Sequence, residues 1–232
     1  MQAKHVMTSP VITVTLDTTV PEIAELLLSR RISGVPVTDA EGKVIGIVTE
    51  GDLLHRAETG TERRRSRWLE LLTGPTGQAS EFVKSHGRRA RDVMTRRVIS
   101  VTPDTELSDI AQIMESERVK RVPVLVDGRA VGIVSRANLL HGLVAYRHAP
   151  QGAAAGAGTE GDMAIRAALL ERLSGERWID LNQVNIVVAD AVVQLWGVVE
   201  NDDQRRALRI AAESVPGVKR IEEHLHRNRF VG

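Results

Sequence analysis

The chain has 232 residues, of which 42% are hydrophobic and 26% are charged, and its formal net charge is +1. This composition is typical of a soluble globular protein of two or three domains and argues against a chain built to coat nucleic acid. The lack of cysteine excludes disulfides, thiolate metal sites and a cysteine nucleophile, and it suits a reducing compartment.

No apolar run approaches the roughly 18 residues that a membrane span needs. The stretch "MQAKHVMTSPVITV" also lacks the apolar core of a signal peptide. We therefore expect a mature protein that starts at or near Met1 and resides in the cytoplasm.

The first structural unit is predicted within residues 1–57. Residues 11–14, "VITV", are typical of a strand, and residues 19–31 have apolar residues at helical spacing with a proline in the first turn. Residues 34–48 read as two strands joined by a turn around Glu41-Gly42. The stretch "TEGDLLHRA" then opens a helix.

The same order of elements returns in residues 91–148. Residues 6–28 align with 93–115, and residues 32–54 align with 119–140 at nearly the same offset, so the unit is duplicated. In the second copy the hairpin turns at Asp127-Gly128, which is a strong turn signal. One copy has too little apolar surface to stand alone, and we expect the two to pack face to face about a pseudo-two-fold axis.

A basic helical insertion, residues 58–90, separates the two copies. The stretch "TERRRSRWLELL" predicts a helix with Trp68, Leu71 and Leu72 on one side. Its arginines can simply be solvated or paired on a surface helix. Alternatively, they form a patch for an acidic partner, which could be phospholipid headgroups, a nucleotide phosphate or nucleic acid.

The C-terminal part begins after a Gly/Ala-rich stretch, residues 149–161, that is typical of a flexible linker. Residues 162–229 predict a small domain in the order helix, strand, strand, helix, strand. Its hairpin turns near Asp190-Ala191, and Asn201 or Asp202 caps its second helix. The linker argues against tight mechanical coupling of this domain to the duplicated part.

The duplicated unit resembles a tandem pair of cystathionine-β-synthase (CBS) domains. The matching stretches are "VMT…VITV", "SGVPVTD" and "GIVTEGDLL" in the first copy, and "VMT…VISV", "KRVPVLVDG" and "GIVSRANLL" in the second. The last unit resembles the BON domain through "VVQLWGVVENDDQRRALRIAAESVPGVKRIEEHL". It departs from that family at Ala191, where a glycine is frequent, and this suggests a different turn type. The resemblance implies an α+β fold, with two face-to-face β-α-β-β-α CBS units followed by an α-β-β-α-β BON domain.

This resemblance implies a regulatory function. CBS pairs bind adenosine-containing ligands such as AMP, ATP, S-adenosylmethionine or NAD in clefts between the copies, and they act as sensors rather than catalysts. BON domains are associated with phospholipid surfaces or with protein partners. We expect a sensor that signals through homodimer formation or through the BON domain, and the alternative is a membrane-surface or protein-interaction adaptor.

A hydroxyl and a short polar side chain recur three residues apart at the end of each hairpin. Thr49 and Asp52 resemble a capping box at a helix start, and Ser135 and Asn138 a poorer version of it. Capping alone would explain the pattern. A functional interpretation adds a helix N-terminus suited to phosphate and a carboxylate that can accept hydrogen bonds from both ribose hydroxyls.

By resemblance, each cleft combines the turn of one copy with the first strand and the "VPV" strand of the other. Thr49 and Asp52 would then face a set of residues in the second copy, namely Ser100, Val119, Lys120, Arg121 and Val122. Ser135 and Asn138, with Arg136 as the nearby cation, would face Thr13, Ile32, Ser33, Gly34 and Val35. Because only the first cleft has a carboxylate and Lys120 or Arg121 for a phosphate, we expect it to be the better nucleotide site.

Catalytic and metal-binding patterns are weak. No acid–base pair or Ser-His-Asp motif stands in a recognisable setting, and His224 and His226 lack a third ligand. With three Trp, one Tyr and two Phe, the chain offers little stacking surface for nucleic acid. We therefore expect a protein that is not an enzyme and requires no cofactor.

Overall fold

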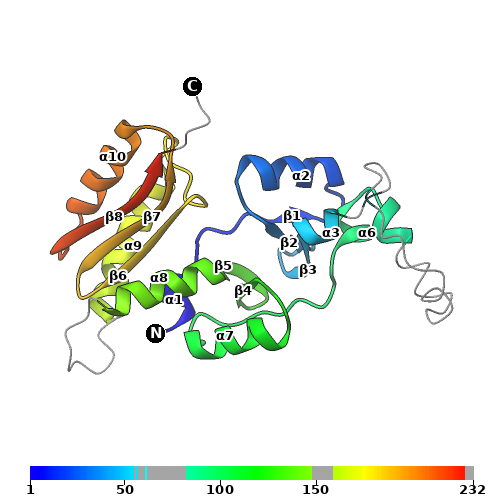
Figure 1. Ribbon diagram of the computed structural model, residues 1–232, viewed down its shortest axis with the longest axis horizontal. Helices are drawn as coiled ribbons and strands as arrows, with labels where there is room; N and C mark the ends of the chain where they lie inside the picture. Colours follow the sequence, from blue (N-terminus) through cyan, green and yellow to red (C-terminus); the bar gives the residue numbers. More distant parts are fainter. Residues whose placement is uncertain (55, 57–60, 62–81, 148–158, 228–232) are drawn as a thin grey trace. The chain divides into compact units, whose positions relative to one another are not determined.

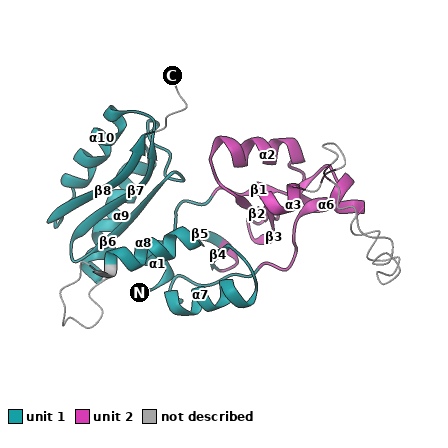
Figure 2. Ribbon diagram, in the orientation of Figure 1, with its two compact units in different colours: residues 1–11, 99–126, 130–232 teal, residues 12–98, 127–129 magenta. Residues whose placement is uncertain are grey.

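The computed structural model describes residues 1–54, 56, 61, 82–147 and 159–227 (Figure 1). The helix predicted from "TERRRSRWLELL" therefore lies outside the described residues, apart from Thr61. The chain divides into two compact units (Figure 2). Unit 1 comprises residues 1–11, 99–126 and 130–232, and unit 2 comprises residues 12–98 and 127–129.

Unit 2 contains most of the first copy. A sheet in the order β1-β2-β3 pairs β1 in parallel and β3 in antiparallel with the central strand. The elements of this copy are β1 (Val14–Thr15), α2 (Val20–Ser29), β2 (Gly34–Thr38), β3 (Val44–Thr49) and α3 (Glu50–Leu53). The predicted order of strands and helices is thus confirmed, and so is the proline in the first turn of α2.

A full capping box starts α2. Thr19 Oγ1 accepts a hydrogen bond from the Glu22 backbone N–H at 3.4 Å, and the Glu22 carboxylate accepts from the Thr19 N–H at 2.7 Å. The Thr19 hydroxyl also donates to the Glu22 carboxylate at 2.6 Å, and this bond, followed by that from the Thr19 N–H, holds the pKa of Glu22 below its usual value. The box fixes the start of the helix whose apolar stripe packs on the sheet.

Unit 2 also contains the opening segment of the second copy. Here α6 (Ala90–Val93) leads into Met94 and Thr95, and Thr95 exchanges two backbone hydrogen bonds of 2.9 and 3.0 Å with Ile47 of β3. The Met94 side chain packs over Gly46, where any side chain on the strand would collide with it. Ala90, Val93 and Met94 are buried in the core of the first copy.

Unit 1 contains the second copy and, in a matching arrangement, the opening segment of the first. Its elements are α1 (Ala3–Val6), α7 (Leu107–Ser116), β4 (Arg121–Val126), β5 (Arg129–Ser135) and α8 (Arg136–Arg147). Thr8 exchanges backbone hydrogen bonds with Ile133, and Met7 packs over Gly132. Each opening segment therefore packs on the hairpin of the other copy.

The second copy shows one difference from the prediction and one confirmation. The stretch "VISV" forms only a single parallel bridge, between Val101 and Val124, rather than a strand. The hairpin turn is confirmed, since Asp127 and Gly128 have φ of 50° and 80°, the left-handed values that a two-residue turn requires.

The C-terminal domain has the predicted order of elements. They are α9 (Glu160–Ser174), β6 (Val184–Ala189), β7 (Val192–Val199), α10 (Asp202–Glu213) and β8 (Arg220–Arg227). The strands pair in the order β6-β7-β8, and both helices pack on the sheet around an apolar core. Thr159 caps α9, which begins at Glu160, two residues before the expected boundary at 162. Asn201 caps α10.

Hydrogen bonds to a carboxylate of α9 hold the hairpin turn of this domain in place. Asp190 and Ala191 have φ of 52° and 61°, so both central residues are left-handed, as in a type I′ turn. The buried Asp162 carboxylate accepts hydrogen bonds from the Ala191 N–H at 2.7 Å and the Asp190 N–H at 3.2 Å. These bonds stabilise a left-handed conformation that is strained for alanine.

Among the described residues, no helix combines the length and the apolar composition that crossing a bilayer would require.

Candidate functional site

The first repeated turn presents one oxygen of its carboxylate outward from the cap. Asp52 Oδ2 accepts hydrogen bonds from the backbone N–H of Thr49 at 2.9 Å and from the Thr49 hydroxyl at 2.7 Å. Asp52 Oδ1 accepts from the Thr95 hydroxyl at 3.2 Å and lies 3.8 Å from Lys84 Nζ. The cap thus uses one oxygen, and among the described residues the other oxygen contacts the Thr95 hydroxyl and, at a longer distance, the Lys84 ammonium.

In the second repeated turn, both polar atoms of the Asn138 side chain are occupied by hydrogen bonds within the protein. Asn138 Oδ1 accepts hydrogen bonds from the Ser135 N–H at 2.8 Å and from the Ser135 hydroxyl at 2.6 Å. Asn138 Nδ2 donates to the Val6 carbonyl at 2.9 Å and to Thr8 Oγ1 at 3.3 Å. Asn138 is 3% exposed, and both polar atoms of its side chain are engaged twice.

The expectation that Ser135 and Asn138 form the poorer capping box is wrong. The Asn138 N–H also donates to Ser135 Oγ at 3.4 Å, so the hydrogen bonds of this box are reciprocal. The difference between the turns lies in the partner from the other copy's opening segment. Thr95 donates its hydroxyl proton to a carboxylate, whereas Thr8 accepts from an amide, and a threonine hydroxyl can do either.

The other residues predicted for the clefts are divided between the units. In unit 2, the end of the "VPV" strand lies beside the first turn, because Gly34 pairs with Thr49 and the Glu50 N–H donates to the Ser33 carbonyl at 3.2 Å. In unit 1, the Arg136 N–H donates to the Lys120 carbonyl at 3.3 Å beside the second turn. The joining of residues from both copies in one cleft stays a prediction.

The exposure of these predicted residues differs widely. Val35 and Val122 are fully buried in the cores of their copies, so a ligand there would meet their backbones. Ile32, Ser33, Val119 and Arg121 are partly buried, and Gly34 is buried. The exposed residues of the set are Thr13, Ser100, Lys120 and Arg136.

The second turn is also joined to the C-terminal domain. The Val6 carbonyl, which accepts from Asn138, accepts a second hydrogen bond from Asn185 Nδ2 of β6 at 2.9 Å. Asn185 Oδ1 in turn lies 3.2 Å from His141 Nδ1 of α8. Arg166 of α9 donates to the Met7 carbonyl at 2.6 Å and to the Ile186 carbonyl at 3.0 Å. We call this set the interdomain joint; its members are Val6, Met7, Asn138, His141, Arg166 and Asn185.

The joint is buried, and its burial disfavours charge. Arg166 is 5% exposed, and desolvation lowers its pKa to about 10. His141 stacks on Trp196 with ring centroids 4.6 Å apart, and Trp196 stacks on His224 at 3.7 Å. Burial lowers the pKa of His141, and burial together with the nearby cations Lys4 and Arg166 lowers the pKa of His5 to about 4. A neutral histidine is therefore favoured at both places.

The joint corrects one expectation from the sequence. The Gly/Ala-rich stretch argued against tight coupling, and residues 148–158 lie outside the described residues. The C-terminal domain nevertheless contacts the second copy directly, through hydrogen bonds and through the apolar cluster of Val6, Ala145, Val187 and Ala189. The C-terminal domain and the second copy are therefore in direct contact.

Several residues of the two turns were not identified from the sequence. Thr8 and Thr95 contact the turns, and Lys84 lies beside Asp52. The repeat held a signal for the first two, because a Met-Thr pair opens both copies at equivalent positions. No pattern in the sequence indicates Lys84.

Comparisons with known proteins agree with this architecture. Residues 3–58 and 90–145 match the family model of the CBS domain, and residues 161–228 match that of the BON domain. The uncharacterized protein MJ1426 of Methanocaldococcus jannaschii is 33% identical over 155 residues, which are 62% of this chain and 92% of that protein. The chloroplastic CBS domain-containing protein CBSX1 of Arabidopsis thaliana is 33% identical over 129 residues, 53% of this chain and 55% of that protein.

A solved structure of the same fold carries a nucleotide. The crystal structure of CBSX2 in complex with AMP is 26% identical, covers 62% of this chain and 96% of that chain, and has a TM-score of 0.54. The duplicated hairpins, the repeated capping turns, the family matches and this similarity lead to one conclusion. The chain belongs to the CBS domain family, with a tandem CBS pair followed by a C-terminal BON domain.

Proposed function

We propose that this chain is a non-catalytic regulatory protein that binds one adenosyl ligand, an adenine nucleotide or a related compound, at the first CBS turn. Thr49 and Asp52 hold the ribose, and the residues predicted to face them complete the site. The Asp52 carboxylate carries the proposal. Its Oδ1 has a hydroxyl at 3.2 Å and an ammonium at 3.8 Å, an arrangement that a ribose diol can replace.

The second turn is not a ligand site in this proposal. Asn138 is 3% exposed and its amide is engaged on both polar atoms, so a ribose would have to displace bonds that hold the joint together. Breaking them without replacement costs about 1–3 kcal/mol for each buried group left unpaired. The preference for the first turn therefore has two causes. The first turn has the Asp52 carboxylate, and at the second turn the Asn138 amide is already hydrogen-bonded within the protein.

Calorimetric titration of the full chain tests the proposal. AMP, ATP, S-adenosylmethionine and NAD are titrated into the wild type, Asp52→Asn and the control Asp104→Asn, which removes an exposed carboxylate paired with Lys4. We expect one site per chain, an affinity roughly tenfold lower in Asp52→Asn, and no change in Asp104→Asn. Failure of all four ligands to bind the wild type would overturn the proposal.

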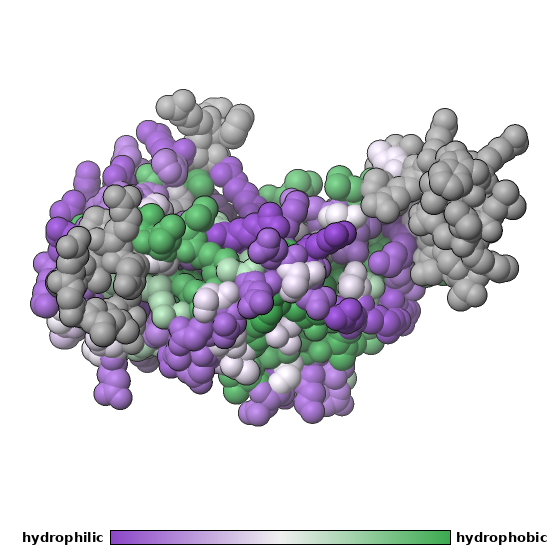
Figure 3. Space-filling model, turned by 60° about the horizontal axis from the view of Figure 1, so that its bottom comes forward, coloured by the Kyte–Doolittle hydropathy of each residue, from purple (hydrophilic) through white to green (hydrophobic). Residues whose placement is uncertain are grey.

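The output of the sensor passes through the joint or through dimerisation. The joint ties the second turn to the BON domain, because the Val6 and Met7 carbonyls accept hydrogen bonds from Asn185 and Arg166. Homodimerisation is supported by apolar side chains that remain exposed on α8. Leu140 and Leu143 of this helix are 62% and 60% exposed. Figure 3 shows that apolar groups lie among hydrophilic ones on the face drawn there. Sedimentation velocity of Leu140→Glu, with the wild type beside it, tests the dimer.

The alternative, an adaptor at a phospholipid surface, gains less support from the BON domain. Several of its cations already pair with carboxylates, including Arg205 with Glu223 at 2.6 Å and Arg209 with Glu213 at 2.9 Å. Paired arginines have little charge left for anionic lipid. Co-sedimentation with anionic vesicles at low salt separates the two functions, and we expect the chain to stay in the supernatant.

A further inference from the structure

The Lys84 side chain lies beside Asp52, the residue proposed to bind the ribose of the ligand. Its Nζ is 3.8 Å from Asp52 Oδ1, and its side chain is 47% exposed, whereas that of Asp52 is 14% exposed. An ion pair at this distance with so exposed a lysine is worth less than about 1 kcal/mol. The contact therefore contributes little to stability, and the ammonium can leave it at small cost.

The backbone that carries Lys84 is held firmly, in contrast to its amine. Arg56 is 4% exposed, and its guanidinium donates to the Lys84 carbonyl at 3.0 Å and to the Gly87 carbonyl at 2.7 Å. The Gly87 N–H donates to the Val83 carbonyl at 2.7 Å. A buried arginine thus fixes the segment, and only the flexible four-carbon stem of Lys84 decides where its charge lies.

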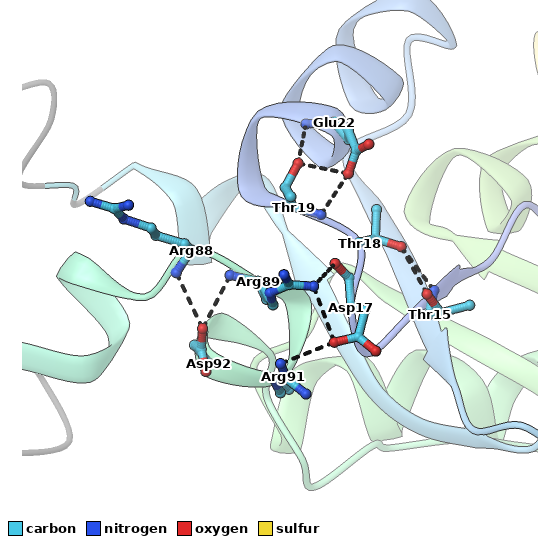
Figure 4. A network of polar contacts seen from close by, with 9 residues as sticks. All are labelled: Thr15, Asp17, Thr18, Thr19, Glu22, Arg88, Arg89, Arg91 and Asp92. Carbon is cyan, nitrogen blue, oxygen red and sulfur yellow. Dashed lines mark hydrogen bonds and ion pairs between the residues drawn. The ribbon is translucent and has the colours of Figure 1, made fainter.

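Two of the neighbouring cations of the segment, Arg89 and Arg91, are paired with Asp17. Figure 4 shows Asp17 between them, and its carboxylate is 3.2 Å from Arg89 Nη1 and 3.0 Å from Arg91 Nη2. The Arg88 side chain extends away from this network, while its backbone N–H donates to Asp92. Lys84 is the member of this group that reaches Asp52.

The turn itself offers little positive potential to a phosphate. α3 is a single turn of four residues, and Glu50 and Asp52 both lie in it. A short helix with two carboxylates is a poor substitute for a cation, because the helix dipole supplies only about half a unit charge even in longer helices. A phosphorylated ligand at Asp52 needs a positive group from outside the turn.

We propose that the Lys84 ammonium binds the phosphate of the ligand at the first turn. When the ribose hydroxyls take Asp52 Oδ1, the Lys84 ammonium moves from the carboxylate to the 5′-phosphate. The site thereby selects phosphorylated adenosine compounds over uncharged adenosine and over the cationic S-adenosylmethionine. This inference rests on the proposed function and names the ligand class of that same site.

Paired titrations of the full chain with AMP and adenosine test this role. Lys84→Met removes the charge and keeps much of the stem, and Lys84→Arg keeps the charge. Arg88→Met is the matched control, since it removes a cation from the same segment and leaves the Lys84 ammonium beside Asp52 in place. We expect Lys84→Met to lower the AMP affinity roughly tenfold and to leave adenosine binding unchanged or slightly tighter. Lys84→Arg and Arg88→Met should resemble the wild type.

The salt dependence gives a second readout. Raising ionic strength should weaken AMP binding to the wild type and leave adenosine binding and Lys84→Met nearly unaffected, because a partly exposed phosphate–ammonium contact is screened. Equal losses for AMP and adenosine in Lys84→Met, or equal losses in Arg88→Met, would overturn the role of Lys84 while the proposed function stands. If neither AMP nor adenosine binds the wild type, the role of Lys84 fails, and the proposed function fails as well when ATP, S-adenosylmethionine and NAD also do not bind.

Discussion

The two repeated turns differ by one functional group, a carboxylate at Asp52 and an amide at Asn138, and they have different surroundings. Asp52 binds its own cap with one oxygen and turns the other toward Thr95 and Lys84. Asn138 uses its amide nitrogen to hold Val6 and Thr8. The comparison teaches that the duplicated turns share their capping geometry, whereas the side-chain atom that is not used in the cap has different partners in the two copies.

Replacing each side chain by the other should reveal the difference between the turns, with the largest loss of stability at the second turn. In Asn138→Asp, a buried carboxylate replaces both N–H donors and faces the Val6 carbonyl oxygen. We expect the free energy of unfolding to fall by about 3 kcal/mol, against less than about 1 kcal/mol for Asp52→Asn. Chemical denaturation followed by circular dichroism measures both. Similar losses in the two variants would show that the turns are equivalent.

Acid should destabilise unit 1, which contains both His5 and the second turn. His5 is 6% exposed, and its Nε2 is buried without a hydrogen-bond partner among the described residues. Because its pKa is lowered to about 4, the unfolded chain binds a proton from about pH 6.5 downward and the folded chain does not. Stability should therefore fall as the pH drops from about 6.5 to about 4, by on the order of 3 kcal/mol.

The variant His5→Gln isolates this effect. It should flatten the pH dependence of the melting temperature in that window, whereas His86→Gln, which alters an exposed histidine of unit 2, should leave it unchanged. An unchanged slope in His5→Gln would assign the acid sensitivity to other groups, of which His141 is the next candidate because burial also lowers its pKa.

A double-mutant cycle sharpens the claim that the second turn and the BON domain share an acceptor. The Val6 carbonyl receives hydrogen bonds from Asn138 and Asn185, so either single change to alanine leaves it one donor. The double variant removes both of these donors, and its loss in the free energy of unfolding should exceed the sum of the single losses by about 1 kcal/mol. Additive losses would mean that the two asparagines act independently.

The smallest effect is expected at the first turn. Lys84→Met should change the free energy of unfolding by less than about 0.5 kcal/mol, because it removes only a long ion pair with an exposed lysine. A loss above 1 kcal/mol in thermal or chemical denaturation would make Lys84 a structural residue and would weaken its assignment to the ligand.

Much of the fold could be predicted because its signals are local. The Asp127-Gly128 turn, the proline-initiated α2 and the Asn201 cap each depend on a few neighbouring residues whose backbone preferences are strong. The strand predicted from "VISV" was wrong beyond one bridge, since β-branched composition favours a strand but cannot supply a partner. The repeat itself indicated both capping turns.

The sequence by itself determined the duplicated hairpins, the order of elements in each domain and the capping pairs Thr49–Asp52 and Ser135–Asn138. Only the tertiary structure decided that each opening segment packs on the other copy, that Asn138 is closed and that Lys84 meets Asp52. The physical reason is separation along the chain. Asn138 and Val6 are 132 positions apart, and Asn185 and Val6 are 179 apart, so no local preference records that they share one carbonyl oxygen.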